Sequence, residues 1–159
     1  MKKTFRLLTI LVFCGFSISM ICQDTYIDPT GTYDLVSKIT QKGNDFYGYS
    51  GQIQVKVLSK EKIIMTFDVN KGAPTYNSGT FIDTLEYFNN KAIYKTPVFD
   101  PSCEINFTFS NKGVTVKEKT KNINCGCGFG HAVVADGFYS KSSSTIPVLK
   151  DPATGDEIK

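Results

Sequence analysis

The sequence is short of the residues that carry most enzyme and metal chemistry. Histidine occurs once among the 159 residues, as His131, and tryptophan is absent. A zinc site takes about four ligands, and a single histidine with few cysteines does not supply them. A Ser-His-Asp or Cys-His arrangement would have to use His131, and no acidic pair is placed to act as general acid and base. These absences predict a protein that is not an enzyme and holds no metal ion or other cofactor.

Long apolar runs are missing as well. None reaches the roughly 20 residues that a membrane-spanning helix needs. The longest uncharged and mostly apolar segment covers 7–21, and it follows an N-terminus with three basic residues. Polar residues begin directly after it. This order predicts a secretory signal peptide over 1–22, and therefore an exported protein, periplasmic or extracellular.

The end of this signal allows more than one form of the mature chain. Cleavage after Ser19 fits the preference for small residues, and cleavage before Gln23 removes Cys22 with the signal. Lipidation of Cys22 would instead anchor the protein to a membrane. Ile21 makes the lipid-anchored form the less favoured alternative, because a small residue normally precedes a lipidated cysteine.

Runs of like charge are also absent. Residues 1–22 contain three of the 18 basic residues and none of the 15 acidic ones, so the mature chain has 15 of each and a formal net charge of zero. Nucleic-acid and anionic membrane surfaces attract clusters of positive charge. The sequence therefore predicts no nucleic-acid partner, and contact with a membrane only through a lipid anchor at Cys22.

Short β-type runs fill the region 30–141. They are rich in Val, Ile, Thr, Tyr and Phe and are separated by turn residues, and several alternate apolar with polar positions. We expect an all-β domain, a single antiparallel meander of about eight strands closed into a small barrel, with a two-sheet β-sandwich as the alternative. Residues 23–29 are expected to be a lead-in and 142–159 a flexible polar tail. The expected strands are 32–38, 47–59, 62–69, 80–88, 91–96, 103–110, 113–120 and 132–140.

Two sequence motifs resemble known families. Thr30-Gly31-Thr32-Tyr33, at the start of the first expected strand, resembles the Gly-x-Trp/Tyr signature of lipocalins and related calycins. This resemblance implies a calycin-like barrel in which Gly31 and Tyr33 are structural residues. Tyrosine stands where many lipocalins have tryptophan.

The second motif combines Cys103 with Cys127-Gly128-Phe129-Gly130 and Asp136-Gly137-x-Tyr139. It resembles a pattern in small exported bacterial proteins, some associated with lysozyme inhibitors and others known only as hypothetical proteins. The resemblance implies structural roles for its glycines and for its tyrosine. These residues are Gly128, Gly130, Gly137 and Tyr139.

Three cysteines lie beyond the expected signal. An exported protein can form disulfides, and on spacing alone Cys103 could pair with Cys125 or with Cys127. The resemblance to the exported proteins favours Cys127. Cys125 is then an extra cysteine, two residues before the expected one. We expect one structural disulfide and one remaining thiol.

Aromatic residues near turns are the candidates for binding. Tyr47 and Tyr49 lie among glycines at the start of a strand, Tyr76 lies in a Gly-bounded loop, and His131 precedes the last expected strand. Tyrosines on loops at a barrel mouth are frequent contact residues. We therefore expect an exported binding protein that holds a protein partner, for example as an inhibitor of a lytic enzyme such as lysozyme, or as an envelope interaction module. The alternative is a lipocalin-like carrier of a small apolar ligand.

Overall fold

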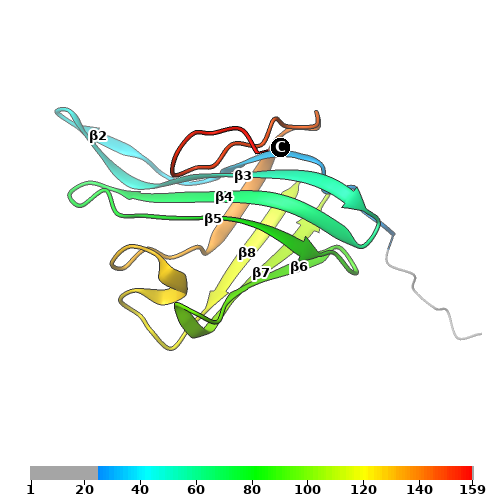
Figure 1. The fold of residues 1–159 in the computed structure, drawn as a ribbon. Coiled ribbons are helices and arrows are strands. Elements are labelled where there is room, and N and C mark those ends of the chain that lie inside the picture. The colour runs from blue at the N-terminus through cyan, green and yellow to red at the C-terminus, as the bar shows by residue number, and fades with distance from the viewer. Residues whose placement is uncertain (1–24, 159) are drawn as a thin grey trace, which may run out of the picture.

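A computed structural model describes residues 25–158 of the chain (Figure 1). The expected signal peptide and Cys22 lie outside the described residues. The prediction of an all-β fold is confirmed: nine strands and one short 3-10 turn make up the regular structure of the described part. The strands are β1 (Gly31–Leu35), β2 (Thr40–Lys42), β3 (Asp45–Ser59), β4 (Lys62–Gly72), β5 (Ser78–Glu86), β6 (Lys91–Thr96), β7 (Asp100–Ser110), β8 (Gly113–Lys119) and β9 (Gly137–Ser143).

Eight of these strands form one antiparallel, barrel-like sheet. Their order is β5-β4-β3-β1-β9-β8-β7-β6, and β2 pairs only with β3. β1 closes the meander, because it pairs with β3 on one side and with β9 on the other. β5 and β6 are the two ends of this order and share no ladder. The link between them carries one β-bridge, between Phe88 and Lys91, and the rings of Phe81 and Tyr94 stack across the gap, so the barrel is nearly closed, with one open seam.

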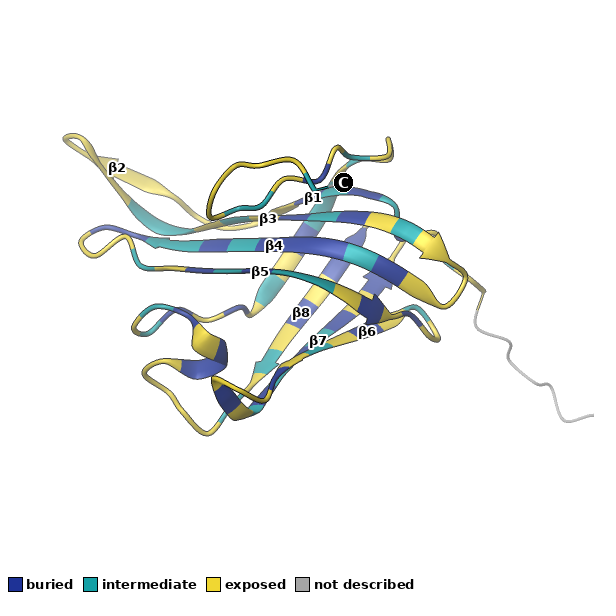
Figure 2. Ribbon diagram, in the orientation of Figure 1, coloured by how far each residue is buried: buried dark blue, intermediate teal, exposed yellow. Residues whose placement is uncertain are grey.

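The core occupies the interior of this sheet. Buried residues alternate with less buried ones along much of the barrel strands (Figure 2), as the sequence pattern predicts, so alternate side chains point inward. Phe67 lies at the centre, stacked on Phe81 at 5.2 Å between ring centroids and edge-on to Phe107 at 6.0 Å. The interior is therefore filled by side chains. The largest fully buried residues are Tyr33, Tyr139, Phe67, Phe107, Ile53, Ile63, Met65, Ile105, Val55, Val69, Val114 and Val116.

The residues of the calycin-like motif support the junction of β1 with β9. The Tyr33 hydroxyl is buried and donates to the carbonyl oxygen of Pro29 at 2.7 Å. Gly31 has a φ of 143°, and a Cβ placed there would collide with the carbonyl oxygen of Ser143 on β9. At the far end of the junction, Gly137 leaves space for the side chain of Leu35. The close approach of the two strands therefore requires a glycine at position 31, where the colliding atom belongs to the backbone.

The expected last strand differs from the structure in its first half. β9 covers Gly137–Ser143, whereas 132–136 is irregular. Ala132 has a φ of 54°, which no strand residue adopts. Val133 and Ala135 are nevertheless buried, so they satisfy the apolar pattern from an irregular backbone. The short β2 was not expected, because its residues are polar and exposed.

The flexible tail expected over 142–159 also differs from the structure. β9 continues to Ser143, and the following segment folds back along the outer side of β3 and β4. Leu149 is buried there, and Lys150 forms a β-bridge with Glu157. Despite its polar composition, this segment contains a few apolar residues, which line a groove together with Leu58 and Ile64.

Candidate functional site

The two ends of the barrel carry different connections. In an antiparallel meander, alternate connections lie at the same end of the sheet. The links β3–β4, β5–β6 and β7–β8 are tight turns of two to four residues. The links β4–β5, β6–β7 and β8–β9 lie at the other end with the β2–β3 hairpin, and the β8–β9 link is the longest of all (Figure 1). We call this end the loop end.

A disulfide fixes the longest loop to the barrel. Cys103 on β7 is bonded to Cys127 in the 3-10 turn Gly126–Gly128, with 5.0 Å between the two Cα atoms, and both cysteines are buried. The pairing implied by the exported-protein motif is therefore the one present. Within the described residues Cys125 has a free, exposed thiol. The bond ties the loop to the start of β7.

A buried carboxylate holds the same region together. Asp100 Oδ2 accepts hydrogen bonds from the Thr120 hydroxyl at 2.5 Å and from the Cys127 amide at 3.1 Å. Its Oδ1 accepts from the Ser102 hydroxyl at 2.7 Å and from the Ser102 amide at 2.9 Å. These bonds, that from Thr120 foremost, hold the pKa of Asp100 well below its ordinary value. One ionised side chain thus joins β7, the end of β8 and the 3-10 turn.

Apolar side chains project from the loops that this cluster fixes. Val98 and Phe99 in the β6–β7 link are 86% and 78% exposed, and Ile123 in the β8–β9 link is 83% exposed. Phe99 immediately precedes Asp100, and Ile123 lies three residues after Thr120, so both loops leave from the same hydrogen-bonded pair. We call Val98, Phe99 and Ile123 the apolar tips. They are the three most exposed large apolar side chains among the described residues.

The binding residues expected from the sequence lie at the loop end but in two groups. The Tyr49 hydroxyl donates to the carbonyl oxygen of Ala132 at 2.9 Å, and the Asn77 side chain donates to the carbonyl oxygen of exposed His131 at 2.9 Å. Tyr49 therefore contacts the β8–β9 link at the residue next to His131. Their polar contacts hold the loop in place.

Tyr76, in the β4–β5 link, and Tyr47, on β3, form the second group beside the β2–β3 hairpin. The Tyr76 hydroxyl donates to the Asp45 carboxylate at 2.8 Å and accepts from the Phe46 amide at 3.3 Å. The Lys42 ammonium lies 5.5 Å from the centre of the Tyr47 ring. Both tyrosines thus contact residues of the hairpin, although Tyr76 stays 44% exposed.

Comparisons with known proteins do not identify a family for this chain. No protein-family model, curated protein or solved structure matches the chain.

Two acidic residues near the loop end accept hydrogen bonds from backbone amides. Glu118 accepts a hydrogen bond from the Ala135 amide at 2.7 Å, and burial raises the pKa of Glu118 above its ordinary value. Asp136 accepts from the Glu118 amide at 2.6 Å and from the Lys117 ammonium at 2.9 Å. These carboxylates stabilise the irregular 132–136 segment. Among the described residues there is no group of three His, Cys, Asp or Glu side chains that could hold a metal ion.

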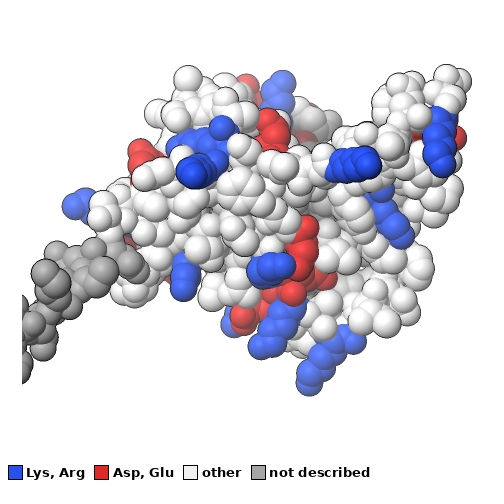
Figure 3. Space-filling model, turned by 180° about the vertical axis from the view of Figure 1, so that it is seen from behind, with Lys and Arg blue, Asp and Glu red and all other residues white. Residues whose placement is uncertain are grey.

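The face of the molecule seen in Figure 3 has no large area of one charge sign that would attract an oppositely charged partner. The face seen from behind in Figure 3 carries both signs interspersed among uncharged residues. Over 25–158, no helix has the length and apolar character needed to cross a bilayer. The loop end therefore carries the three most exposed large apolar side chains of the described residues, and no field of one charge.

Proposed function

We propose that this protein is an exported, non-enzymatic binding protein whose loop end docks on a protein partner. The observation that carries the proposal is the exposure of Val98, Phe99 and Ile123 on loops fixed by the Cys103–Cys127 disulfide and by Asp100. Export rests on the signal-type pattern of 1–22, and a disulfide is compatible with it.

Energetics support a contact role for the tips. Full burial of an aliphatic or aromatic side chain contributes about 1.5–3 kcal/mol, so each tip that a partner covers adds a contribution of this size to the interface. Aromatic and large apolar anchors dominate binding energy when they enter a pocket on the partner. Because the disulfide and the Asp100 bonds already fix the loops, little conformational entropy is lost on docking.

The packed interior favours this function over a carrier of a small apolar ligand. A carrier needs a cavity of a few hundred Å³ inside the barrel. The inward side chains of this barrel contact one another instead, with Phe67 stacked between Phe81 and Phe129 at 5.2 and 5.9 Å. A ligand of that size would have to displace aromatic side chains.

An inhibitor of a lytic enzyme is the first version to test. The exported protein should slow the hydrolysis of peptidoglycan by at least one lysozyme, or else retain a specific envelope protein on an affinity column. The exposed surface predicts that Phe99→Ser or Ile123→Ser abolishes the effect without lowering the melting temperature.

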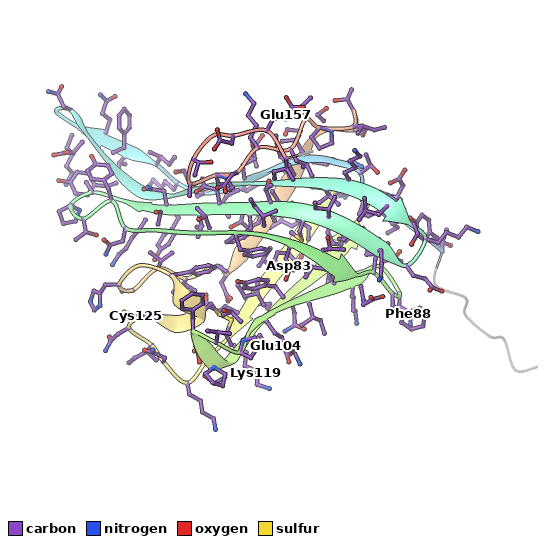
Figure 4. All side chains as sticks on the ribbon, viewed as in Figure 1. Asp83, Phe88, Glu104, Lys119, Cys125 and Glu157 are labelled. Carbon is purple, nitrogen blue, oxygen red and sulfur yellow. A yellow bond between two sulfur atoms is a disulfide. The ribbon has the colours of Figure 1, made fainter. Side chains whose placement is uncertain are left out.

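Phe88→Ser is the matched control. Phe88 is 72% exposed against 78% for Phe99, and it lies on the β5–β6 turn, at the opposite end of the barrel from the loop that carries Cys125 (Figure 4). If the control abolishes binding as strongly as Phe99→Ser, the loop end is not the docking surface. If the wild-type protein neither inhibits a lysozyme nor retains an envelope protein, the proposed function is wrong.

A further inference from the structure

A thiol and a disulfide lie two residues apart in the β8–β9 link. Within the described residues Cys125 has a free, exposed thiol at the loop end (Figure 4), whereas Cys127 is bonded to Cys103. Docking through the apolar tips uses the disulfide only to fix the loop, and it leaves the thiol without a role. A thiolate that reaches a disulfide can exchange with it, because disulfides break and re-form by thiolate attack on sulfur.

The chain keeps this thiol close to the disulfide. Only Gly126 separates the two cysteines of the link, so their Cα atoms are at most about 7.6 Å apart. Asn122 holds the backbone of Cys125 here, since its Oδ1 accepts from the Cys125 amide at 3.1 Å and its Nδ2 donates to the Cys125 carbonyl at 3.5 Å. A disulfide needs Cα atoms within about 7 Å of each other. Because Cys127 is already 5.0 Å from Cys103, a local rearrangement of this short segment brings Cys125 into range.

Loop closure gives neither pairing an advantage. Cys103 and Cys127 are 24 positions apart, and pairing with Cys125 shortens the closed loop by only two residues. Loop-closure entropy follows the logarithm of loop length, so it is nearly the same for both pairings. Cys127 also has a φ of 59°, in the left-handed region that residues other than glycine rarely adopt. Release of its sulfur allows Cys127 to leave that region, which favours exchange.

Contacts on both sides of the two cysteines depend on which one is paired. In the form with the Cys103–Cys127 bond, called the resting form, Asp100 Oδ2 accepts from the Cys127 amide at 3.1 Å, and Phe129 is buried in the core. Withdrawal of Cys127 breaks the first contact and loosens the second. Ile123 lies two residues before Cys125, so a bond at Cys125 draws this apolar tip toward the barrel. The pairing therefore sets the position of the tip.

We propose that the Cys125 thiol exchanges with the Cys103–Cys127 disulfide, and that this exchange switches the loop end between the resting form and a second form. The Cys125 thiolate attacks Cys103 Sγ and forms a new sulfur–sulfur bond. The bond between Cys103 and Cys127 breaks, and its electron pair leaves with the Cys127 sulfur, which takes up the proton that Cys125 gave up. These three cysteines still hold one thiol and one disulfide, so no oxidant or reductant is consumed.

Thiol trapping measures the exchange in the exported wild-type protein, purified without reductant. The resting form is isolated by chromatography at pH 5, where thiolate attack is slow, and is then brought to pH 8. Samples are alkylated with N-ethylmaleimide at intervals and digested without reduction, and tandem mass spectrometry locates the label. Cys125 should carry the label at first, and label at Cys127, with a bridge between Cys103 and Cys125, should rise to a constant fraction.

Three results would overturn the proposal. Label that never reaches Cys127 would show that the disulfide does not exchange. Label at Cys103 would mean that the thiolate attacks the other sulfur and joins Cys125 to Cys127. A rate of labelling at Cys127 that grows with protein concentration would show exchange between molecules and not within one.

Two serine variants fix the two pairings and test their structural effect. Cys127→Ser leaves only the bond between Cys103 and Cys125, whereas Cys125→Ser keeps the resting bond and is the matched control. The Gly130 amide, which donates to the Ser78 carbonyl at 2.9 Å, should exchange with deuterium roughly tenfold or more faster in Cys127→Ser than in the control. Equal protection in the two variants would contradict a change of form. If Cys127→Ser does not fold, trapping in the wild type still decides.

The effect on docking rests on the proposed function, but the exchange does not. Cys125→Ser should dock as the wild type does, and Cys127→Ser should lose docking as Ile123→Ser does. Full docking by a folded Cys127→Ser variant would show that the pairing does not control the tip. Neither trapping nor amide exchange needs a docking partner, so a chain that exchanges but never docks would refute the proposed function alone.

Discussion

At the scale of single residues, Asp100 is the side chain on which most of the loop end depends. Its two oxygens accept four hydrogen bonds from Thr120, Ser102 and Cys127. In Asp100→Asn an amide NH₂ donor replaces one of these oxygens and meets groups that are themselves donors. We expect the variant to fold with a melting temperature several degrees lower at pH 7, as differential scanning calorimetry would show.

The pH dependence gives this prediction a second measurement. Because the hydrogen bonds lower the pKa of Asp100 in the folded state, its contribution to stability is complete above the unfolded value of about 3.9 and is lost as pH falls toward the folded value. The difference in melting temperature between the wild type and Asp100→Asn should therefore shrink below pH about 4. A difference that stays constant from pH 7 to pH 3 would show that the carboxylate charge is not involved.

Sequence reasoning reached the loop end but not its most exposed residues. Tyrosine and histidine between turn residues drew attention to Tyr49, Tyr76 and His131, and all three lie there. The hydroxyls of Tyr49 and Tyr76, however, are bonded to Ala132 and Asp45. Val98 and Ile123 gave no signal, because an apolar residue between turn residues looks the same whether it packs inward or projects outward. Only the placement of the neighbouring chain decides that.

At the scale of elements, the junction of β1 with β9 depends on Gly31. Its φ of 143° is unfavourable for other residues, and a Cβ would meet the Ser143 carbonyl. We expect Gly31→Ala to lower the free energy of unfolding by about 1–3 kcal/mol, measured by urea denaturation. Gly43→Ala is the comparison, since φ is also positive there but nothing lies within 4 Å of the new Cβ. Equal losses in both variants would mean that backbone strain, and not the close approach of β9, sets the cost.

Alternation predicted the regular strands well and the irregular segments poorly. β3, β6 and β8 begin and end within two residues of the expected limits. A strand with one solvent-exposed face and one buried face alternates polar and apolar residues, and this alternation is visible in the sequence. The segment 132–136 shows a similar pattern, yet its backbone bonds go to Glu118 and Gly130 rather than to a strand. Burial fixes which side chains point inward, but the hydrogen-bond partners of the backbone depend on distant residues.

At the scale of the whole molecule, the barrel could be predicted from the sequence, but the open seam between β5 and β6 could not. A meander with one apolar face must wrap around a shared core, so a barrel-like sheet could be predicted. Whether the first and last members of the strand order meet depends on the size of the enclosed side chains. Here Phe81 of β5 and Tyr94 of β6 stack across the seam with 3.8 Å between ring centroids. β5 and β6 are therefore joined across the seam by stacked side chains, where neighbouring strands elsewhere are joined by backbone hydrogen bonds.

The packed interior predicts how the whole barrel responds to apolar ligands. Phe107 is fully buried and lies edge-on to Phe67 and Phe81 at 6.0 and 6.1 Å. Phe107→Ala should lower the free energy of unfolding by about 3–5 kcal/mol and leave a dry cavity. Such cavities bind benzene, and a ligand that binds only the folded state raises its melting temperature. Benzene should therefore stabilise Phe107→Ala and leave the wild type unchanged in thermal melts. A rise in the wild-type melting temperature with benzene would instead indicate a hollow barrel and favour the carrier function, because a filled core offers such a ligand no space.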